Sequence, residues 1–279
     1  MKVWLVQMEP VVCDKKTNLS KIEDYVKRAV HEDVALIVFP ELSLTGYVCG
    51  TQFFDLAENV PGPTTKFISD IVAKTNTEVV LGLPEKVGHL IFNTAVLIGD
   101  GVLAKQRKLF LPNFRFGGVT YEEMMYFSTG TEINTFSSKL GKLGVEICYD
   151  FWYPEIVRAH SMQGAWLNIN ISAAPVGVPE FFQQLAKARA LENVSTFAYV
   201  NQVGVQEGVR FGGGTCVVSH LGDIMQCLSI GEKAREEYIS IELEESAVTR
   251  ARLDLPILRD VRPEVLDNVS GICEKVLKG

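Results

Sequence analysis

Three segments of the sequence each place a residue with reactive chemistry where a predicted strand ends and a loop begins. The candidates are a glutamate, a lysine and a cysteine. A carboxylate can carry protons, and a thiol can attack an electrophilic carbon. Loops that follow strands are where α/β proteins usually build their sites. The candidates are Glu41 in FPELSLTGY (39–47), Lys108 in QRKLFLPN (106–113) and Cys148 in GVEICYDFWYPE (144–155).

Taken singly, each candidate has two interpretations. Burial beside the run ALIV would raise the pKa of Glu41 toward the range useful for proton transfer, but a glutamate after a strand is more often solvated. Lys108 fits a surface cation whose stem lies along apolar surface. Cys148 precedes Pro154, which suits the first turn of a helix. A sharp strand-to-helix turn would lower the pKa of its thiol, yet a buried structural cysteine fits equally well.

The elements that must position these segments alternate between β-rich runs and amphipathic stretches along the whole chain. Strands that follow one another directly near residues 78–107 point to a mixed sheet or two packed sheets, in a layered α/β fold. The predicted strands are 2–8, 34–39, 78–83, 91–98, 143–148, 166–172, 197–203, 214–219 and 237–243. The predicted helices are 18–31, 63–75, 154–163, 180–194 and 263–277.

In this order, the three segments resemble the signature regions of the nitrilase, or carbon–nitrogen hydrolase, superfamily. Shorter similarities extend over nearly the whole chain, at QMEP, PGP, GLPE, ARALEN and NQVG. The resemblance implies one nitrilase-like domain over 1–279. Its fold would be a four-layer αββα sandwich of two mixed β-sheets flanked by helices. It also implies a homodimer or a higher homo-oligomer.

The same resemblance implies a Glu–Lys–Cys triad of Glu41, Lys108 and Cys148. Cys148 would attack the carbonyl carbon of a small linear amide, while Lys108 and the backbone N–H of Tyr149 hold the oxyanion. Glu41 would take the thiol proton, pass it to the departing nitrogen and then activate water against the thioester. The reaction would turn a carboxamide into a carboxylate and ammonia.

Further site residues are expected around the triad. The segment YEEMMYF (121–127) matches the surroundings of a fourth family residue that orients substrate, and Glu123 is preferred to Glu122. An arginine, Arg115 or Arg210, could pair with a substrate carboxylate, although ordinary salt bridges explain both equally well. The residues expected to bind substrate are Tyr47, Arg115, Tyr149, Ala173 and Ala174.

The substrate itself stays open. LPNF followed by the Tyr-Glu-Glu pattern looks most like the glutaminase domain of glutamine-dependent NAD synthetases, which suggests a small primary carboxamide. Aromatic residues 151–153 depart from many relatives after the Cys-Tyr-Asp core. The remaining alternatives are a nitrilase or an N-carbamoyl amidohydrolase with the same triad, and a non-catalytic binding or assembly member.

Other classes of site are disfavoured. The chain has four histidines and no known cysteine-protease signature, and His160 is expected to face away from Cys148. No spacing of histidines and cysteines suggests zinc, and neither a metal nor a cofactor is expected. The other five cysteines are interpreted as small buried side chains.

Composition limits the partners. With 279 residues, 47% of them hydrophobic, the chain can bury a full core. A net charge of −7 opposes binding to nucleic acid or anionic lipid. Neither a secretory signal nor an apolar stretch of about 18 residues is evident, so we expect a cytoplasmic protein that meets only its small substrate and water.

Overall fold

The structure contains two six-stranded sheets, and five strands of the first come from the amino-terminal part of the chain. The computed structural model describes residues 1–116 and 118–278. The strand order is β16-β1-β2-β3-β4-β5. Neighbours β1, β2 and β3 run parallel and the other pairs are antiparallel, so the sheet is mixed. The strands are β1 (Lys2–Gln7), β2 (Leu36–Val38), β3 (Glu78–Val87), β4 (Leu90–Gly99), β5 (Gly101–Arg107) and β16 (Glu237–Glu242).

The second sheet repeats this plan with the order β15-β14-β11-β10-β9-β8. Its central strands β9, β10 and β11 are parallel, and the outer pairs are antiparallel. The strands are β8 (Thr135–Ser138), β9 (Gly141–Ile147), β10 (Leu167–Ser172), β11 (Thr196–Asn201), β14 (Cys216–Val218) and β15 (Ile224–Cys227).

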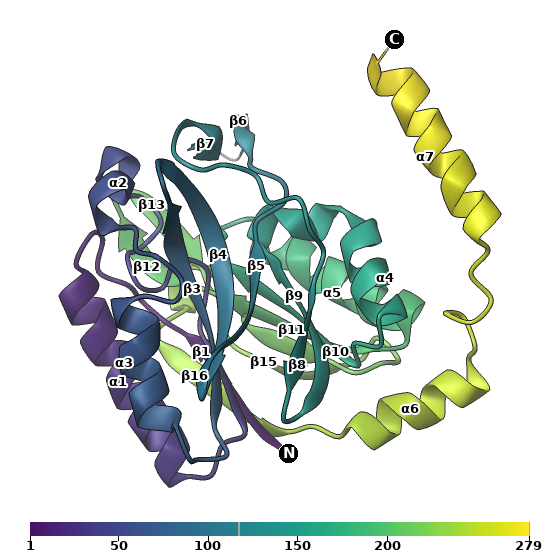
Figure 1. Cartoon of the computed structure of the whole chain (residues 1–279), viewed down its shortest axis with the longest axis horizontal. Coiled ribbons are helices and arrows are strands. Elements are labelled where there is room, and N and C mark those ends of the chain that lie inside the picture. Colours follow the sequence, from purple (N-terminus) through teal and green to yellow (C-terminus); the bar gives the residue numbers. More distant parts are fainter. Residues whose placement is uncertain (117, 279) are drawn as a thin grey trace.

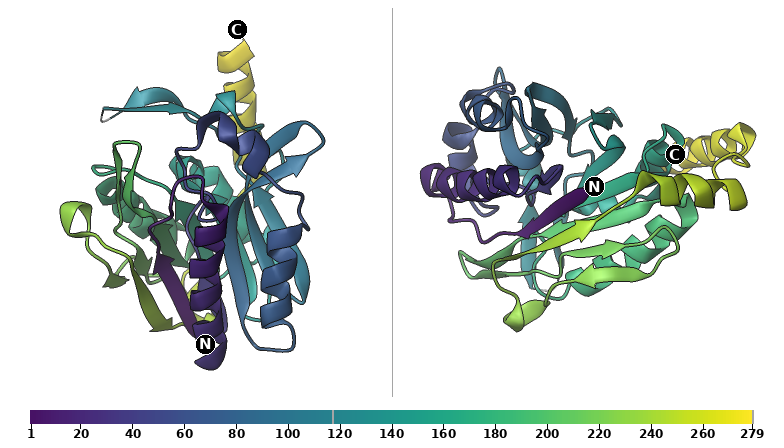
Figure 2. Two further views of the ribbon diagram at one scale, coloured as in Figure 1. Left: turned by 90° about the vertical axis from the view of Figure 1, so that its left-hand side faces the viewer. Right: turned by 90° about the horizontal axis from the view of Figure 1, so that it is seen from below.

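Successive side chains of β1 pack into two different layers of the hydrophobic core. Val3 and Leu5 belong to the core that joins the two sheets, whereas Trp4 and Val6 pack with the helices outside the first sheet. Helices α1 (Lys15–His31) and α3 (Pro63–Val72) lie on the opposite side of the molecule from α4 (Pro154–Met162) and α5 (Pro179–Asn193) (Figures 1 and 2). The αββα sandwich is confirmed.

Two hairpins and several short turns lie outside the sheets. The β6–β7 hairpin projects from the upper end of the sandwich in Figure 1. The hairpins are β6 (Asn113–Phe116) with β7 (Val119–Glu122), and β12 (Val203–Gln206) with β13 (Val209–Gly212). The short elements are η1 (Gly50–Gln52), α2 (Phe53–Leu56), η2 (Glu123–Met125), η3 (Cys148–Trp152) and η4 (Gly231–Lys233).

The carboxyl-terminal helices extend away from the sandwich. Helix α6 (Glu245–Asp254) runs along its lower edge, and α7 (Pro263–Lys278) stands apart from the body in Figure 1. Apolar side chains of α7 are exposed at positions that share one face of the helix. They are Val265, Leu266, Val269, Ile272, Val276 and Leu277.

Candidate active site

Cys148 lies at a sharp turn between a strand and a helix. Strand β9 ends at Ile147, and Cys148 has a φ of +48°, in the left-handed region that residues with a side chain seldom adopt. Asn170 on the neighbouring strand donates a hydrogen bond to the Cys148 carbonyl at 3.3 Å. The turn then leads into α4, which begins at Pro154 as expected. A strained backbone held in this way is typical of a functional residue.

Beside this turn, Lys108 joins the carboxylates of Glu41 and Glu123, and these three side chains form the Lys108 cluster. Its Nζ lies 2.7 Å from Glu41 Oε1 and 2.6 Å from Glu123 Oε1. Glu41 and Lys108 are 0% exposed, and Glu123 is 4% exposed. Glu41 also accepts hydrogen bonds from Asn93 Nδ2 at Oε1 and from the Ala173 backbone at Oε2, both at 2.7 Å. The site therefore gathers groups that follow β2, β5, β9 and β10.

The surroundings of Cys148 favour the protonated form of its thiol. Burial raises its pKa, and the carboxylates of Glu41 and Glu123 raise it further. Lys108 and a hydrogen bond from the Ala173 backbone act in the opposite direction without offsetting them. The turn was expected to lower this pKa, but burial and the two nearby acids raise it instead. A neighbouring base must remove the proton.

The charges around Lys108 are strongly coupled. Burial disfavours its charged form, but Glu123 and Glu41 outweigh this effect and raise the pKa of Lys108 well above its ordinary value. Burial, opposed by Lys108, raises the pKa of Glu123 to about 7. Tyr47 donates its hydroxyl to Glu123 Oε1 at 2.6 Å. Glu123 Oε2 is buried, and no hydrogen-bond partner for it occurs among the described residues. That oxygen is available to a substrate.

Asp150 connects the lysine segment to the cysteine turn. Its Oδ1 accepts hydrogen bonds from the backbone N–H of Leu109 at 3.1 Å and of Phe110 at 2.8 Å, and its Oδ2 accepts one from Ile147 at 3.3 Å. Sequence reasoning gave Asp150 no role. Its position two residues after Cys148 is the sequence feature that could have indicated a role in the site.

A second set of polar side chains holds the glutamate segment in place. Gln202 Nε2 donates to the Glu41 carbonyl at 2.5 Å, and Gln206 Nε2 donates to Gln202 Oε1 at 2.6 Å. Gln206 Oε1 in turn accepts from the Tyr47 backbone at 2.8 Å. Nearby, Asn201 Oδ1 accepts from the backbone of Ala174 at 2.8 Å. The sequence analysis assigned no role to these buried amides or to Asn93. Each is a polar residue within an apolar strand or next to its end, which is the feature that could have indicated them.

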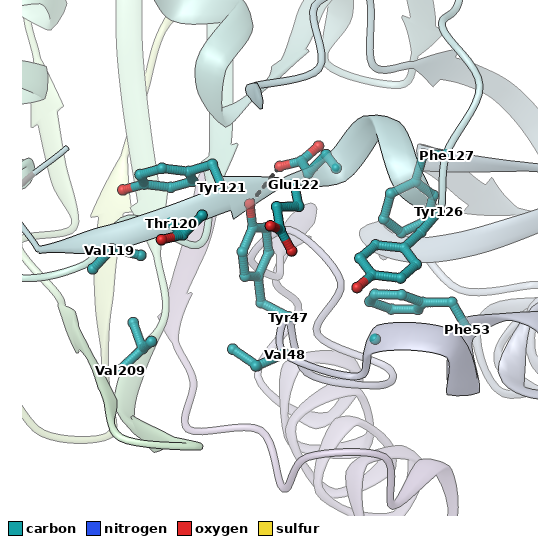
Figure 3. Close-up of a pocket in the computed structure, with 12 residues that line it drawn as sticks. Tyr47, Val48, Phe53, Val119, Thr120, Tyr121, Glu122, Tyr126, Phe127 and Val209 are labelled. Carbon is teal, nitrogen blue, oxygen red and sulfur yellow. Dashed lines mark hydrogen bonds between the residues drawn. The ribbon is translucent and has the colours of Figure 1, made fainter. Parts of the chain in front are cut away.

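Two cavities reach the site. One, of about 520 Å³, is lined by Cys148, Tyr149 and Ala174 together with many aromatic side chains. The other, of about 150 Å³, is lined by Glu123, Tyr47 and their neighbours and is drawn in Figure 3. Tyr121 lines both cavities. The larger cavity therefore reaches Cys148, and the smaller one reaches Glu123.

The structure brings most of the expected residues together. Glu123 contacts Lys108, whereas Glu122 is exposed. Ala173 holds Glu41 through its backbone and does not line the larger cavity. Arg115 is a correction: it is exposed and absent from the lining of both cavities, because successive side chains of β6 point to opposite faces. Arg210 is likewise exposed.

The structure also locates His160, the histidine that follows Cys148 in the chain. His160 on α4 packs against Gly144 in the middle of β9: a Cβ added at Gly144 would lie 2.7 Å from His160 Cβ. His160 therefore sits away from the sulfur at the strand end.

Within residues 1–116 and 118–278, no group of three histidine, cysteine or acidic side chains is arranged to hold a metal ion. Over the same residues, no helix is long and apolar enough to span a bilayer.

The other cysteines only partly match their expected burial. Cys49 and Cys216 are buried and Cys13 is half-buried, but Cys227 and Cys273 are exposed. Cys227 lies opposite Cys216 on paired strands. A hydrogen bond from Cys216, helped by one from Gln183, lowers the pKa of Cys227 to about 7. The pKa of Cys227, outside the site, is thus shifted in the opposite direction from that of Cys148.

Comparison with known proteins identified relatives along most of the chain. The chain is 32% identical over 235 residues to a probable nitrilase of Schizosaccharomyces pombe, covering 80% of this chain and 82% of that protein. It is 31% identical over 257 residues to the glutamine-dependent NAD(+) synthetase of Thermotoga maritima, covering 88% of this chain and 42% of that protein. The crystal structure of Saccharomyces cerevisiae Nit3 superposes with a TM-score of 0.80 at 28% identity, covering 92% of this chain and 94% of that one.

The family assignment follows from the extent of the match. The family model of carbon–nitrogen hydrolases matches residues 2–252, which include every residue of the Lys108 cluster and the Cys148 turn. The chain is also similar to proteins named probable nitrilase, (R)-stereoselective amidase and omega-amidase. The chain belongs to the carbon–nitrogen hydrolase family and is a hydrolase of this class.

Proposed function

We propose that the protein hydrolyses the carboxamide of a small linear amide through a thioester on Cys148. The observation that carries this proposal is the position of Lys108 Nζ between the carboxylates of Glu41 and Glu123, beside a cysteine at a strained turn. Buried charges are costly to maintain, so their presence around a thiol indicates chemistry.

In the first half-reaction, Glu41 removes the proton of the Cys148 thiol as the sulfur attacks the carbonyl carbon. Coupled transfer is needed because burial and the nearby carboxylates keep the pKa of that thiol high. The oxyanion of the tetrahedral adduct is stabilised by Lys108 and by the backbone N–H of Tyr149. Glu41 then protonates the nitrogen, the C–N bond breaks and ammonia leaves.

In the second half-reaction, Glu41 removes a proton from water, and the hydroxide attacks the thioester carbon. The C–S bond breaks, the sulfur regains its proton, and a carboxylic acid is released. One amide and one water thus give one acid and one ammonia. Glu41 is suited to both steps because Asn93 and the Ala173 backbone fix both of its oxygens.

Glu123 holds both Lys108 and the substrate in position. It orients Lys108 through Oε1, which is also held by the Tyr47 hydroxyl. Its unpartnered Oε2 can accept a hydrogen bond from the amide nitrogen of the substrate. Tyr149 and Ala174 contact the substrate in the larger cavity.

The test combines substrate turnover with detection of the intermediate. The protein is incubated with short amides, glutamine, asparagine, N-carbamoyl acids and nitriles, while ammonia release and intact mass are recorded. Amides should give ammonia and an acyl adduct that maps to Cys148. Cys148→Ala should abolish both, and Cys216→Ala, at a buried cysteine outside the cluster, should not. Turnover of nitriles or carbamoyl acids alone would replace the amide assignment, and absence of any product would indicate a binding member.

We also propose that the protein forms a homodimer or a higher homo-oligomer in the cytoplasm. The exposed apolar face of α7 supports assembly, because such a face is normally covered. All six cysteines are free thiols, which suits a reducing compartment. Light scattering should give at least twice the monomer mass, and Ile272→Glu should reduce it. An unchanged monomer for both proteins would contradict this proposal.

A further inference from the structure

The larger cavity is walled on one side by the β6–β7 hairpin. Phe114 and Phe116 point from β6 into the cavity, and Tyr121 joins them from β7. The Phe114 ring lies 5.2 Å from the ring of Tyr121 and 5.2 Å from that of Tyr149. These distances are typical of aromatic contacts. Phe116 remains 47% exposed, so part of its ring is free to contact a ligand.

The opposite wall comes from the turn after Cys148 and from the start of α5. Trp152 lies 5.9 Å from Phe182 in an edge-to-face arrangement, and both line the cavity. Val178 and Phe181 extend the apolar surface toward the rim. Trp152 is 44% exposed and Phe181 is 45% exposed, so this wall also keeps apolar surface available.

Charge is missing from the lining. Among the described residues that line this cavity, none is an aspartate, glutamate, lysine, arginine or histidine. Lys108 and Glu41 are fully buried and do not line this cavity, and Arg115 is exposed and does not line it either. A substrate carboxylate placed in this cavity would lose water and gain no counter-ion. An apolar group would instead bury surface against the aromatic walls.

We infer that the acyl group of the substrate is uncharged and apolar, of the size of an arylalkyl or medium-chain aliphatic group. This inference rests on the proposed amide hydrolysis and specifies its substrate class. A cavity of about 520 Å³ lies within the range of small-molecule sites, roughly 300–1,000 Å³. The carboxamide lies at the sulfur, and the side group extends between the hairpin and the start of α5.

A matched set of amides tests the inference. 3-Phenylpropanamide and hexanamide carry apolar groups, glutaric acid monoamide and glutamine carry a carboxylate, and acetamide reports turnover without a side group. We expect kcat/KM for 3-phenylpropanamide to exceed that for glutaric acid monoamide about 100-fold or more. If acetamide is turned over through Cys148 but the carboxylate amides are preferred, this inference alone is overturned. If no amide is turned over, the proposed function fails with it.

Variants of the walls provide the second test. Phe116→Ala and Trp152→Ala should each lower the ratio of kcat/KM for 3-phenylpropanamide to that for acetamide by about tenfold. Phe67→Ala, on the exposed side of α3, should leave the ratio unchanged. Phe181→Arg introduces a cation at a lining position where the native side chain is partly exposed, so the charged group can stay hydrated. This variant should raise the ratio of kcat/KM for glutaric acid monoamide to that for 3-phenylpropanamide about tenfold. Ratios unchanged in all three cavity variants would overturn the inference.

Discussion

Nζ of Lys108 lies 2.7 Å from Oε1 of Glu41, and both side chains are fully buried although 67 positions separate them in the chain. Because neither charge reaches water, each one is stabilised mainly by its buried partners. Removing one partner of a buried pair strands the remaining charge and costs roughly 3–5 kcal/mol. Substitutions here therefore require a stability measurement beside every rate.

Glu41→Gln should reduce kcat by about 100- to 10,000-fold, because the amide side chain cannot accept the thiol proton. The variant retains an oxygen and an NH2 group to keep part of the hydrogen bonding around Asn93 and Lys108. Steady-state kinetics with the preferred amide, accompanied by circular dichroism, provide the measurement. A folded Glu41→Gln protein with near-normal rates would exclude the proton-transfer role.

Lys108→Met should lose most turnover and about 3–5 kcal/mol of unfolding free energy at pH 8, since Glu41 and Glu123 would face each other without a cation. Part of the loss should return at pH 5.5, where one carboxyl takes up a proton. Urea unfolding at both pH values measures the change. The exposed Lys86→Met serves as the control, and equal stability of Lys108→Met and Lys86→Met at pH 8 would contradict the assigned pairing.

Glu123→Gln should flatten the pH dependence of stability. The pKa of Glu123 is raised from 4.5 to about 7, so the folded protein holds a proton that the unfolded chain releases. Stability contributed by this proton is present below about pH 4.5 and is lost as pH rises toward 7. The wild-type protein should lose on the order of 1–3 kcal/mol across this window through Glu123. Identical pH profiles for the two proteins in urea unfolding would contradict the shift.

Asp150→Ala should lower both stability and kcat, because the backbone N–H groups of Leu109, Phe110 and Ile147 would lose their acceptor. Each buried donor left unpaired costs about 1–3 kcal/mol. Asp150→Asn keeps one acceptor oxygen and should recover much of both losses. If kcat fell equally in the two variants while stability recovered in Asp150→Asn, the carboxylate would have a role beyond positioning.

Labelling with iodoacetamide at pH 7 should modify Cys227 first. Its pKa is lowered to about 7 and it is exposed, whereas the Cys148 thiol is buried with a raised pKa. Peptide mapping measures the order, and Cys227→Ser should remove the fast phase. Only labelling of Cys148 should be slowed by a bound substrate analogue. Fast labelling at Cys148 in the free protein would show that its sulfur is already ionised.

Much of the architecture is predictable from local pattern. The ranges 78–83 and 91–98 appear as β3 and β4, and 154–163 appears as α4 within one residue. Short strands such as β8 and β15 and the hairpin β12–β13 were missed, because a few residues carry little periodicity. Helix α6 was also missed, and only one of its residues, Val248, is buried.

The candidate site was predictable only where a motif marked it. Glu41, Lys108, Cys148 and Glu123 were identified from their segments. Asn93 and Gln202 act through contacts between distant segments, which no local pattern encodes. The raised pKa of Cys148 depends on the summed charges around it, and the exposure of Arg115 depends on which face of β6 meets the cavity.

Asp150 ties the segment of Lys108 to the turn of Cys148, and the β6–β7 hairpin begins only three residues after Phe110. Asp150 thus joins Lys108 and the Cys148 turn through contacts that lie outside the hairpin. Insertions or substitutions in the hairpin can reshape the cavity while the distances among Lys108, Glu41 and the sulfur stay fixed. In this protein, new substrate ranges can evolve separately from the chemistry that serves them.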